Sequence, residues 1–299
     1  MVTNLTRRKG FKSLTGYVFI LPALFFVGFF LLIPIIQNVY YSFFNWDGLS
    51  VPKFIGFDNY INIFKDPNFS LSFFNTIIWV LFTILFPVTI ALFLAYFIKG
   101  VKRENTYKSI FYFPLVISTV STSVIWQYMY SYRVGAISSF LNDILKLNIP
   151  IRFLNEPYVN TIAMIIAFSW QAMGGFMVLF LMGLNSIPIS PLENARVDGA
   201  SKLQTFIYIV IPMLAPIITI VVGTAIVNSF KIFDIIYIMT KGGPFRSSET
   251  LAVTMVRESF TVSRFGYGAS IAVLLSVVVI IITAFYIGKI TKTDQYQDK

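Results

Sequence analysis

The chain has 299 residues, of which 57% are hydrophobic and only 12% are charged, and its mean hydropathy is +0.76. Soluble domains carry about 25% charged residues, so this composition excludes an ordinary soluble protein. A net charge of +10 would suit a nucleic-acid binder, but the basic residues flank apolar runs, which indicates membrane topology instead. The absence of Cys and His excludes disulfides, thiolate metal sites and the commonest general base, so most enzyme classes lose their chemistry.

Six apolar segments are long enough to cross a bilayer, which takes about 20 residues of helix. In chain order, the predicted spans cover residues 17–42, 73–98, 109–130, 158–181, 206–230 and 267–288. None of the six contains Asp or Glu, and a charged group costs roughly 3 kcal/mol or more at a helix centre. The first apolar run continues to about residue 44, too long for a signal peptide, so we expect it to be retained. The sequence therefore predicts an all-α integral membrane protein, a six-transmembrane-helix bundle.

The basic residues between the spans predict the orientation of the chain. With the N-terminus inside, the inner segments hold their Lys and Arg in short stretches, whereas the outer loops spread a similar number over much longer segments. Basic residues close to spans are retained on the cytoplasmic side. We therefore expect a multi-pass protein with both termini in the cytoplasm, as tails 1–16 and 290–299.

The most informative segment, residues 187–205, joins the fourth and fifth spans on the predicted cytoplasmic side. Ser190 and Glu193 have the spacing of a capping box, with Pro191 at the first helical position, so we expect a short helix to begin here. Gly199 should end it, because Gly readily takes the backbone angles of a helix stop. The small residues Ala195, Gly199 and Ala200 would let another surface approach closely. The alternative is an amphipathic linker.

The run from Glu193 to Ala200, Glu-Asn-Ala-Arg-Val-Asp-Gly-Ala, followed by Pro212 and Pro216, resembles the EAA loop of binding-protein-dependent ABC import permeases. Asn194 departs from the commonest form of that loop in one position. In the family this loop is the coupling helix that docks into a cleft of the cytoplasmic ATPase. The resemblance therefore assigns five residues to ATPase coupling. They are Glu193, Ala195, Asp198, Gly199 and Ala200.

The resemblance extends roughly from residue 75 to residue 286, and over this range the sequence is similar to the maltose-type carbohydrate branch of these permeases. It rests on four further motifs in order, beginning at Phe111, Trp170, Thr240 and Phe265. It implies the type I ABC importer permease fold over residues 70–289, behind a first helix at 17–44, in a prokaryotic plasma membrane. It also implies a heterodimer with a second permease subunit, two cytoplasmic ATPase subunits and an extracytoplasmic sugar-binding protein.

No Walker sequence occurs in the chain, so we expect the partner ATPase to bind ATP and Mg, with no cofactor, metal or catalytic residue in this chain. A sugar needs hydrogen-bonding groups and an aromatic face inside a protected cavity. The third, fourth and fifth spans offer such residues, including Trp126, Gln127 and Trp170. The resemblance places substrate contacts at Thr119, Phe168, Gln171, Gly175, Asn228 and Ser229. Alternatively, these six residues form hydrogen bonds between helices, or the partner permease subunit binds the sugar instead.

Two other classes of protein fit the sequence less well. A secondary transporter or channel would show inverted repeats, interrupted helices or intramembrane ionisable residues, and none is evident in the sequence. An intramembrane enzyme would need an acid, base, nucleophile or metal ligand at membrane depth. Within the importer interpretation, a neutral sugar fits an uncharged cavity, whereas a phosphorylated polyol would need a basic residue, which only Lys231 offers near the cavity mouth.

Overall fold

The computed structural model describes residues 7–132, 134–146 and 152–297. These residues form two units, one containing the chain up to Ile63 together with Arg257–Leu274, and the other containing Phe64–Val256 and the chain from Leu275 onward. Almost all regular structure is helical, and short π-helical turns, labelled η, lie within several helices.

The first unit begins with one long helix whose apolar side chains are largely exposed, as expected for a span that faces lipid. A small antiparallel ribbon follows, in which Phe44 pairs with Phe54. The side-chain amide of Asn59 donates to the carbonyl oxygens of Ser42 and Phe44, at 2.8 and 3.0 Å, and holds the ribbon against the next helix. These elements are α1 (Arg7–Val27), η1 (Gly28–Leu32), α2 (Ile33–Tyr41), β1 (Phe44–Asn45), β2 (Lys53–Phe54), α3 (Asp58–Lys65) and η5 (Arg257–Thr261).

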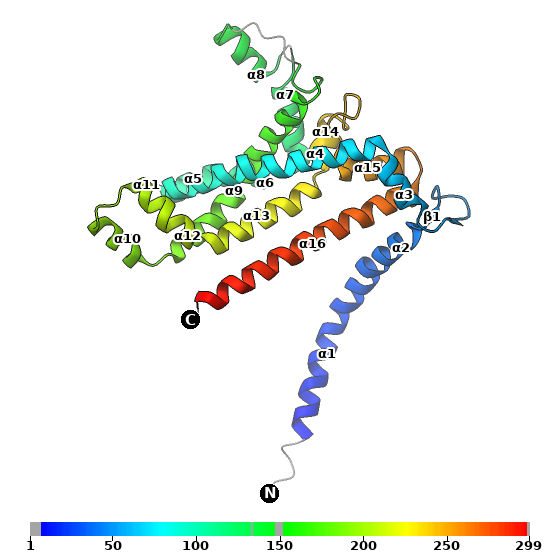
Figure 1. Cartoon of the computed structure of the whole chain (residues 1–299), viewed down its shortest axis with the longest axis horizontal. Coiled ribbons are helices and arrows are strands. Elements are labelled where there is room, and N and C mark those ends of the chain that lie inside the picture. Colours follow the sequence, from blue (N-terminus) through cyan, green and yellow to red (C-terminus); the bar gives the residue numbers. More distant parts are fainter. Residues whose placement is uncertain (1–6, 133, 147–151, 298–299) are drawn as a thin grey trace. The chain divides into compact units, whose positions relative to one another are not determined.

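The second unit contains the second to fifth predicted spans (Figure 1). The second span is α4 (Pro67–Thr83), η2 (Ile84–Val88) and α5 (Thr89–Ile98), the third is α6 (Glu104–Val116) and α7 (Thr119–Met129), and the fourth is α9 (Val159–Ser186). The fifth is α11 (Lys202–Thr205), η4 (Phe206–Val210), α12 (Ile211–Met213) and α13 (Ala215–Phe230). The remaining elements are α8 (Ala136–Ser139), η3 (Phe140–Ile144), α10 (Ile189–Val197), α14 (Asp234–Met239) and α15 (Leu251–Val256). The sixth span is α16 (Phe265–Gln297), which continues from the first unit.

The predicted six-helix membrane fold is confirmed, with one correction. Four spans are continuous helices, but the third bends by 95° between α6 and α7, and the fifth bends by 72° between α12 and α13. Ile117 is extended at the first break, and Pro216 near the start of α13 lacks a backbone donor at the second. The expectation that no helix is interrupted was therefore wrong.

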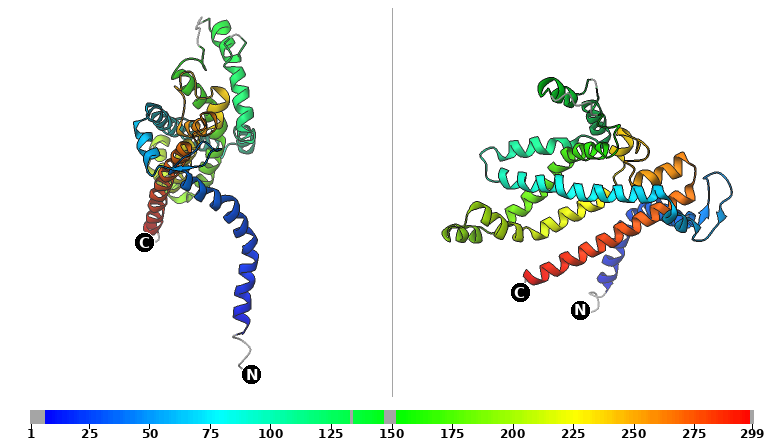
Figure 2. Two further views of the ribbon diagram at one scale, coloured as in Figure 1. Left: turned by 90° about the vertical axis from the view of Figure 1, so that its right-hand side faces the viewer. Right: turned by 45° about the horizontal axis from the view of Figure 1, so that its top comes forward.

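The core of the second unit is built around α9, the most buried of the continuous spans. One buried cluster joins α9 to α5 and α13, and a second joins it to α4 and α14. Both figures place α10 beyond the ends of α5 and α9, at the opposite end of this unit from α14 (Figures 1 and 2). The unit thus has one end that carries residues 187–205, here called the coupling segment, and another that carries the loops predicted to lie outside, here called the outer-loop end.

Candidate functional site

The break in the third span places polar backbone and side-chain groups inside the second unit. After α6 ends, Ile117 is extended, and the Ser118 hydroxyl accepts a hydrogen bond of 3.2 Å from the backbone N–H of Ser121, which starts α7. The carbonyl oxygen of Ile117 accepts a 2.7 Å hydrogen bond from Nε2 of Gln171 on α9. Gln171 is only 7% exposed. A buried amide thus satisfies a backbone group that the break would otherwise leave unpaired.

Two adjacent glycines on α9 face α6 beside this break and have different roles. A Cβ atom on Gly174 would clash with the carbonyl oxygen of Phe111, so only Gly allows the two backbones this approach. A Cβ atom on Gly175 would instead meet the flexible end of Leu115, at 3.2 Å. Gly174 therefore sets the helix packing, and Gly175 forms part of an open wall.

That wall belongs to a cavity of about 530 Å³, here called the transport cavity, which α6, α7, α9 and α13 surround. Its lining residues are Leu115, Val116, Ile117, Ser118, Thr119, Phe168, Gln171, Ala172, Gly175, Phe176, Leu179, Thr224 and Asn228. The structure thus brings together five of the six predicted substrate contacts, Thr119, Phe168, Gln171, Gly175 and Asn228. Ser229 does not line the cavity, because it is buried and its hydroxyl donates to the carbonyl oxygen of Ala225 at 2.8 Å.

The transport cavity offers uncharged hydrogen-bonding groups and one aromatic face. Within the described part of the chain, the side chains of Thr119 and Asn228 have no hydrogen-bond partner, and no ionisable side chain lines the cavity. Thr224, which the sequence analysis missed, lies four residues before Asn228 and therefore on the same face of α13. Thr224 and Asn228 are exposed, and polar groups are costly in lipid, so this face suits contact with water or another protein.

Three other candidates lie elsewhere. The rings of Trp126 and Trp170 pack edge to face with centroids 6.0 Å apart. Gln127 lines a different cavity, at the C-terminal end of α7. None of these three side chains lines the transport cavity.

The coupling segment, residues 187–205, contains the expected short helix with a different start. The capping-box prediction for Ser190 and Glu193 was wrong, because α10 begins at Ile189 and no side chain caps its N-terminus. The capping box belongs instead to α11, where the Ser201 hydroxyl accepts from the backbone N–H of Gln204 and the Gln204 side chain accepts from the backbone N–H of Ser201. The same Ser-x-x-Gln spacing was readable in the sequence but was overlooked.

Gly199 ends α10 as predicted. It has a φ of +76°, and its N–H donates to the carbonyl oxygen of Arg196 at 3.2 Å, while the N–H of Ala200 donates to that of Ala195 at 2.9 Å. This pair of bonds is the Schellman arrangement, which favours Gly at the left-handed position. Glu193 and Asp198 are exposed, whereas Ala195 is only 6% exposed. The expectation that Ala195 contributes to an open docking surface is therefore corrected: it is covered within this chain.

The coupling segment is fixed to the core at both ends. Ile187, before α10, and Phe206, after α11, belong to the same buried cluster. The Phe206 ring also packs against Tyr96 of α5, with ring centroids 4.5 Å apart. Between these anchors, Ile189 and Val197 expose large apolar side chains. The segment is therefore packed into the core at both ends and exposes apolar side chains between them.

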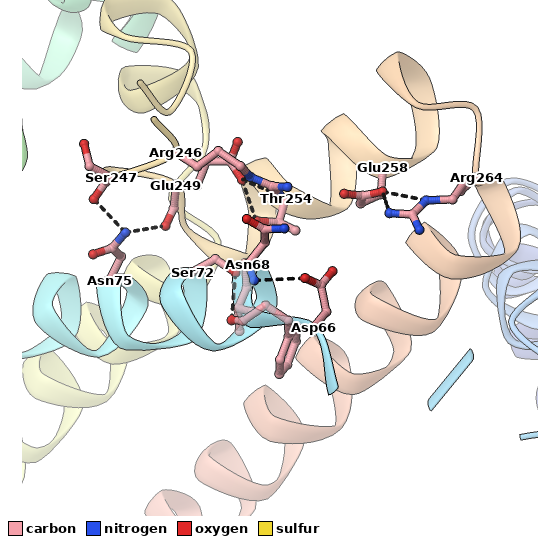
Figure 3. A network of polar contacts seen from close by, with 12 residues as sticks. Asp66, Asn68, Ser72, Asn75, Arg246, Ser247, Glu249, Thr254, Glu258 and Arg264 are labelled. Carbon is pink, nitrogen blue, oxygen red and sulfur yellow. Dashed lines mark hydrogen bonds and ion pairs between the residues drawn. The ribbon is translucent and has the colours of Figure 1, made fainter. Parts of the chain in front are cut away.

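The outer-loop end of the second unit has a polar network that the sequence analysis did not identify (Figure 3). The buried amide of Asn75 on α4 donates to the carbonyl oxygens of Ser247 and Glu249, each at 2.9 Å. The Glu249 carboxylate, only 1% exposed, accepts from Nε of Arg246 at 2.8 Å and from the Thr254 hydroxyl at 3.0 Å. These contacts connect the loop between α14 and α15 to α4 and α15.

Comparison with known proteins identifies the family. Residues 71–291 match the binding-protein-dependent transport system inner membrane component family, and the chain belongs to that family. The osmoprotective compounds uptake permease protein GgtC of Synechocystis is 34% identical over 88% of this chain and 94% of its own. The multiple sugar-binding transport system permease protein MsmF of Streptococcus mutans is 30% identical over 95% of this chain and 97% of its own.

The fold also matches solved structures of one importer. A chain in the crystal structure of a bacterial ABC transporter that imports the acidic polysaccharide alginate has a TM-score of 0.84 at 20% identity, covering 96% of this chain and 98% of that chain. This likeness shows the type I importer permease fold. The chain is therefore a multi-pass inner-membrane permease subunit of an ATP-driven importer, a family in which the ATPase is a separate subunit. The secondary transporter or channel considered above is excluded by this membership.

Proposed function

We propose that this permease subunit forms half of a translocation pathway for a neutral carbohydrate. The observation that carries the proposal is the transport cavity, where five residues chosen from the sequence meet around uncharged polar groups and the ring of Phe168. A sugar of one or two rings fits a cavity of about 530 Å³. The names of the relatives GgtC and MsmF, which concern osmoprotective compounds and multiple sugars, support the same solute class.

A phosphorylated substrate is less well matched. Phosphate groups are held by Arg or Lys, and Lys231, the basic residue considered for this role, does not line the transport cavity. Placing a dianion among uncharged groups at membrane depth would carry a large desolvation cost. The lining therefore favours a solute whose hydroxyl groups bind to Thr119, Asn228 and the carbonyl oxygen of the Gln171 side chain.

The partners follow from the two ends of the second unit. The exposed polar face at Thr224 and Asn228 would be covered by a second permease subunit, which completes the pathway as a heterodimer. Two cytoplasmic ATPase subunits, which bind ATP and Mg, would dock on the coupling segment through Glu193, Asp198, Gly199 and Ala200. An extracytoplasmic sugar-binding protein would deliver the solute at the outer-loop end, with both termini of this chain in the cytoplasm.

The mechanism we propose is a rigid-body switch. Because Ile187 and Phe206 anchor both ends of the coupling segment in one buried cluster, a displacement of α10 by the ATPase would move α5, α9 and α13 together. Of these helices, α9 and α13 carry walls of the transport cavity, so ATP binding and hydrolysis would alternate its access between the two sides of the membrane.

The proposal is tested with the complete importer reconstituted in vesicles, with ATP on the cytoplasmic side and the binding protein on the other. Labelled maltose, trehalose, lactose, a sugar phosphate and an amino acid are compared as solutes. We expect ATP-dependent uptake of at least one neutral sugar and none of the sugar phosphate or the amino acid. Uptake of the sugar phosphate or the amino acid alone, or uptake without ATP, would contradict the proposal.

A further inference from the structure

A second cavity lies at the other end of α7 from the transport cavity. It has a volume of about 730 Å³ and is here called the outer cavity. On α7, Thr119 lines the first cavity and Gln127 lines the second, so their backbone positions lie about 12 Å apart along the helix. The outer cavity's walls include Tyr130, Ser131, Tyr132, Arg152, Asn155 and Gly243.

The walls of the outer cavity are tied together by hydrogen bonds between segments far apart in the chain. The hydroxyl of Tyr130 donates to the carbonyl oxygen of Ala163 on α9 at 2.9 Å. The side-chain amide of Asn160, also on α9, donates to the carbonyl oxygen of Gly243 at 2.7 Å. Both the end of α7 and the loop after α14 are thus fixed to the same central helix. The cavity is a built feature of the fold.

Its chemistry differs from that of the transport cavity. The guanidinium carbon of Arg152 lies 5.5 Å from the centre of the Tyr132 ring, which places a planar donor over an aromatic face. Within the described part of the chain, the side chains of Ser131 and Asn155 have no hydrogen-bond partner. Among the residues that the structure describes, none that lines the cavity carries a carboxylate. An aromatic ring, a forked donor and unpartnered hydroxyl and amide groups together suit a ring with many hydroxyls.

We propose that the outer cavity is a second carbohydrate site, which the solute occupies on its way to the transport cavity. The inference rests on the carbohydrate function proposed above and adds a binding step on the outer side. Hydroxyl groups of the sugar bind to Arg152, Asn155 and Ser131, and one face of the ring lies against Tyr132. The concave shape and small size of the cavity fit a small molecule better than the surface of a protein partner.

The test uses the absence of Cys from this chain. Ser131→Cys reports on the outer cavity, with Asn155→Cys as a second reporter there if the first variant does not assemble. Thr119→Cys reports on the transport cavity, and Ser50→Cys, on the exposed loop between β1 and β2, is the control outside both cavities. Each variant is studied in the complete reconstituted importer. Modification of this chain by a small maleimide is followed with and without the neutral sugar that the uptake assay finds transported.

We expect the sugar to slow modification of Ser131→Cys about threefold at twice its Kd, because the unoccupied fraction falls by that factor. Modification of Ser50→Cys should not change. Adding Arg152→Ala should abolish the protection of Ser131→Cys and leave that of Thr119→Cys in place.

Protection of Thr119→Cys without protection at position 131 or 155 would overturn the second site and leave the proposed function intact. If the complex transports none of the neutral sugars in the uptake assay, and none of those sugars protects position 119, 131 or 155, both proposals are overturned. Equal protection of Ser131→Cys by sugar-free binding protein and by sugar would assign the outer cavity to a protein contact and also overturn the proposal.

Discussion

Nε2 of Gln171 donates a 2.7 Å hydrogen bond to the carbonyl oxygen of Ile117, so a residue chosen as a substrate contact also holds the break between α6 and α7. We therefore expect Gln171→Ala to impair uptake and also to lower the stability of the subunit by about 1 kcal/mol, the net value of a typical buried hydrogen bond. Asn228→Ala should impair uptake alone, because within the described part of the chain its side chain has no partner to lose. Thermal unfolding of the purified complex and uptake kinetics separate the two effects. Unchanged uptake in both variants would move the sugar site to the partner permease.

The neighbouring glycines should respond differently to the same added methyl group. Gly174→Ala puts a Cβ atom against a backbone carbonyl on α6, so we expect a loss of about 1–3 kcal/mol and poor accumulation in the membrane. Gly175→Ala meets only the flexible end of Leu115, so the subunit should accumulate normally and the narrowed cavity should raise the KM for larger sugars. Membrane abundance and uptake of a mono- and a disaccharide provide the measurement. Equal abundance of the two variants would show that α6 and α9 do not approach as closely as described.

The outer loop should loosen when its buried amide is removed. Asn75→Ala leaves the carbonyl oxygens of Ser247 and Glu249 without their donor, and each buried unpaired group costs about 1–3 kcal/mol. We expect faster protease cleavage between α14 and α15 and a lower unfolding midpoint. Asn62→Ala, at an exposed position on α3, is the matched control and should change neither. If Asn75→Ala behaves like Asn62→Ala, the network in Figure 3 does not hold the loop.

Membrane orientation can be tested with single Cys residues at exposed positions. Ser247 is half-buried, so Phe245, which is 94% exposed, is the better outer position together with Ser50. Lys102, exposed between α5 and α6, is the inner position. An impermeant reagent added to intact cells should label Ser50→Cys and Phe245→Cys but not Lys102→Cys. The reverse pattern would show that the termini lie outside.

Much of this architecture could be predicted because lipid imposes a simple rule on sequence. Long acid-free apolar runs predicted all six spans, and side-chain chemistry together with the family resemblance selected five residues that line one cavity. Hydropathy carries no information about the direction of a helix axis, so it did not predict the bends at Ile117 and before Ala215. These depend on a cap at Ser118 and on local backbone geometry.

Other errors have equally local causes. Ser229 lies beside Asn228, but consecutive residues on a helix face about 100° apart, so Ser229 is turned into the core and bonds to Ala225. Ala195 was assigned to a docking surface by its small size and by the family resemblance, whereas its burial depends on how α10 lies against the chain. The contacts of Asn75 and Asn160 join residues more than eighty positions apart and left no periodic signal.

If the coupling segment transmits the work of a separate ATPase to the transport cavity, a change in its backbone should uncouple hydrolysis from uptake. Gly199→Val is the direct test, because Val is strained at a φ of +76° and should disrupt the C-terminal cap of α10. Gly100→Val is a closely matched control, since Gly100 has a φ of +78° and, like Gly199, has open space around its Cβ position.

The decisive measurement is sugar uptake together with sugar-stimulated ATP hydrolysis in vesicles, after both variants have been shown to insert normally. We expect Gly199→Val to lose ATPase co-purification or to uncouple hydrolysis from uptake, whereas Gly100→Val should keep both near the wild-type level. Wild-type co-purification, hydrolysis and uptake in Gly199→Val would show instead that the segment is a passive linker with no part in coupling.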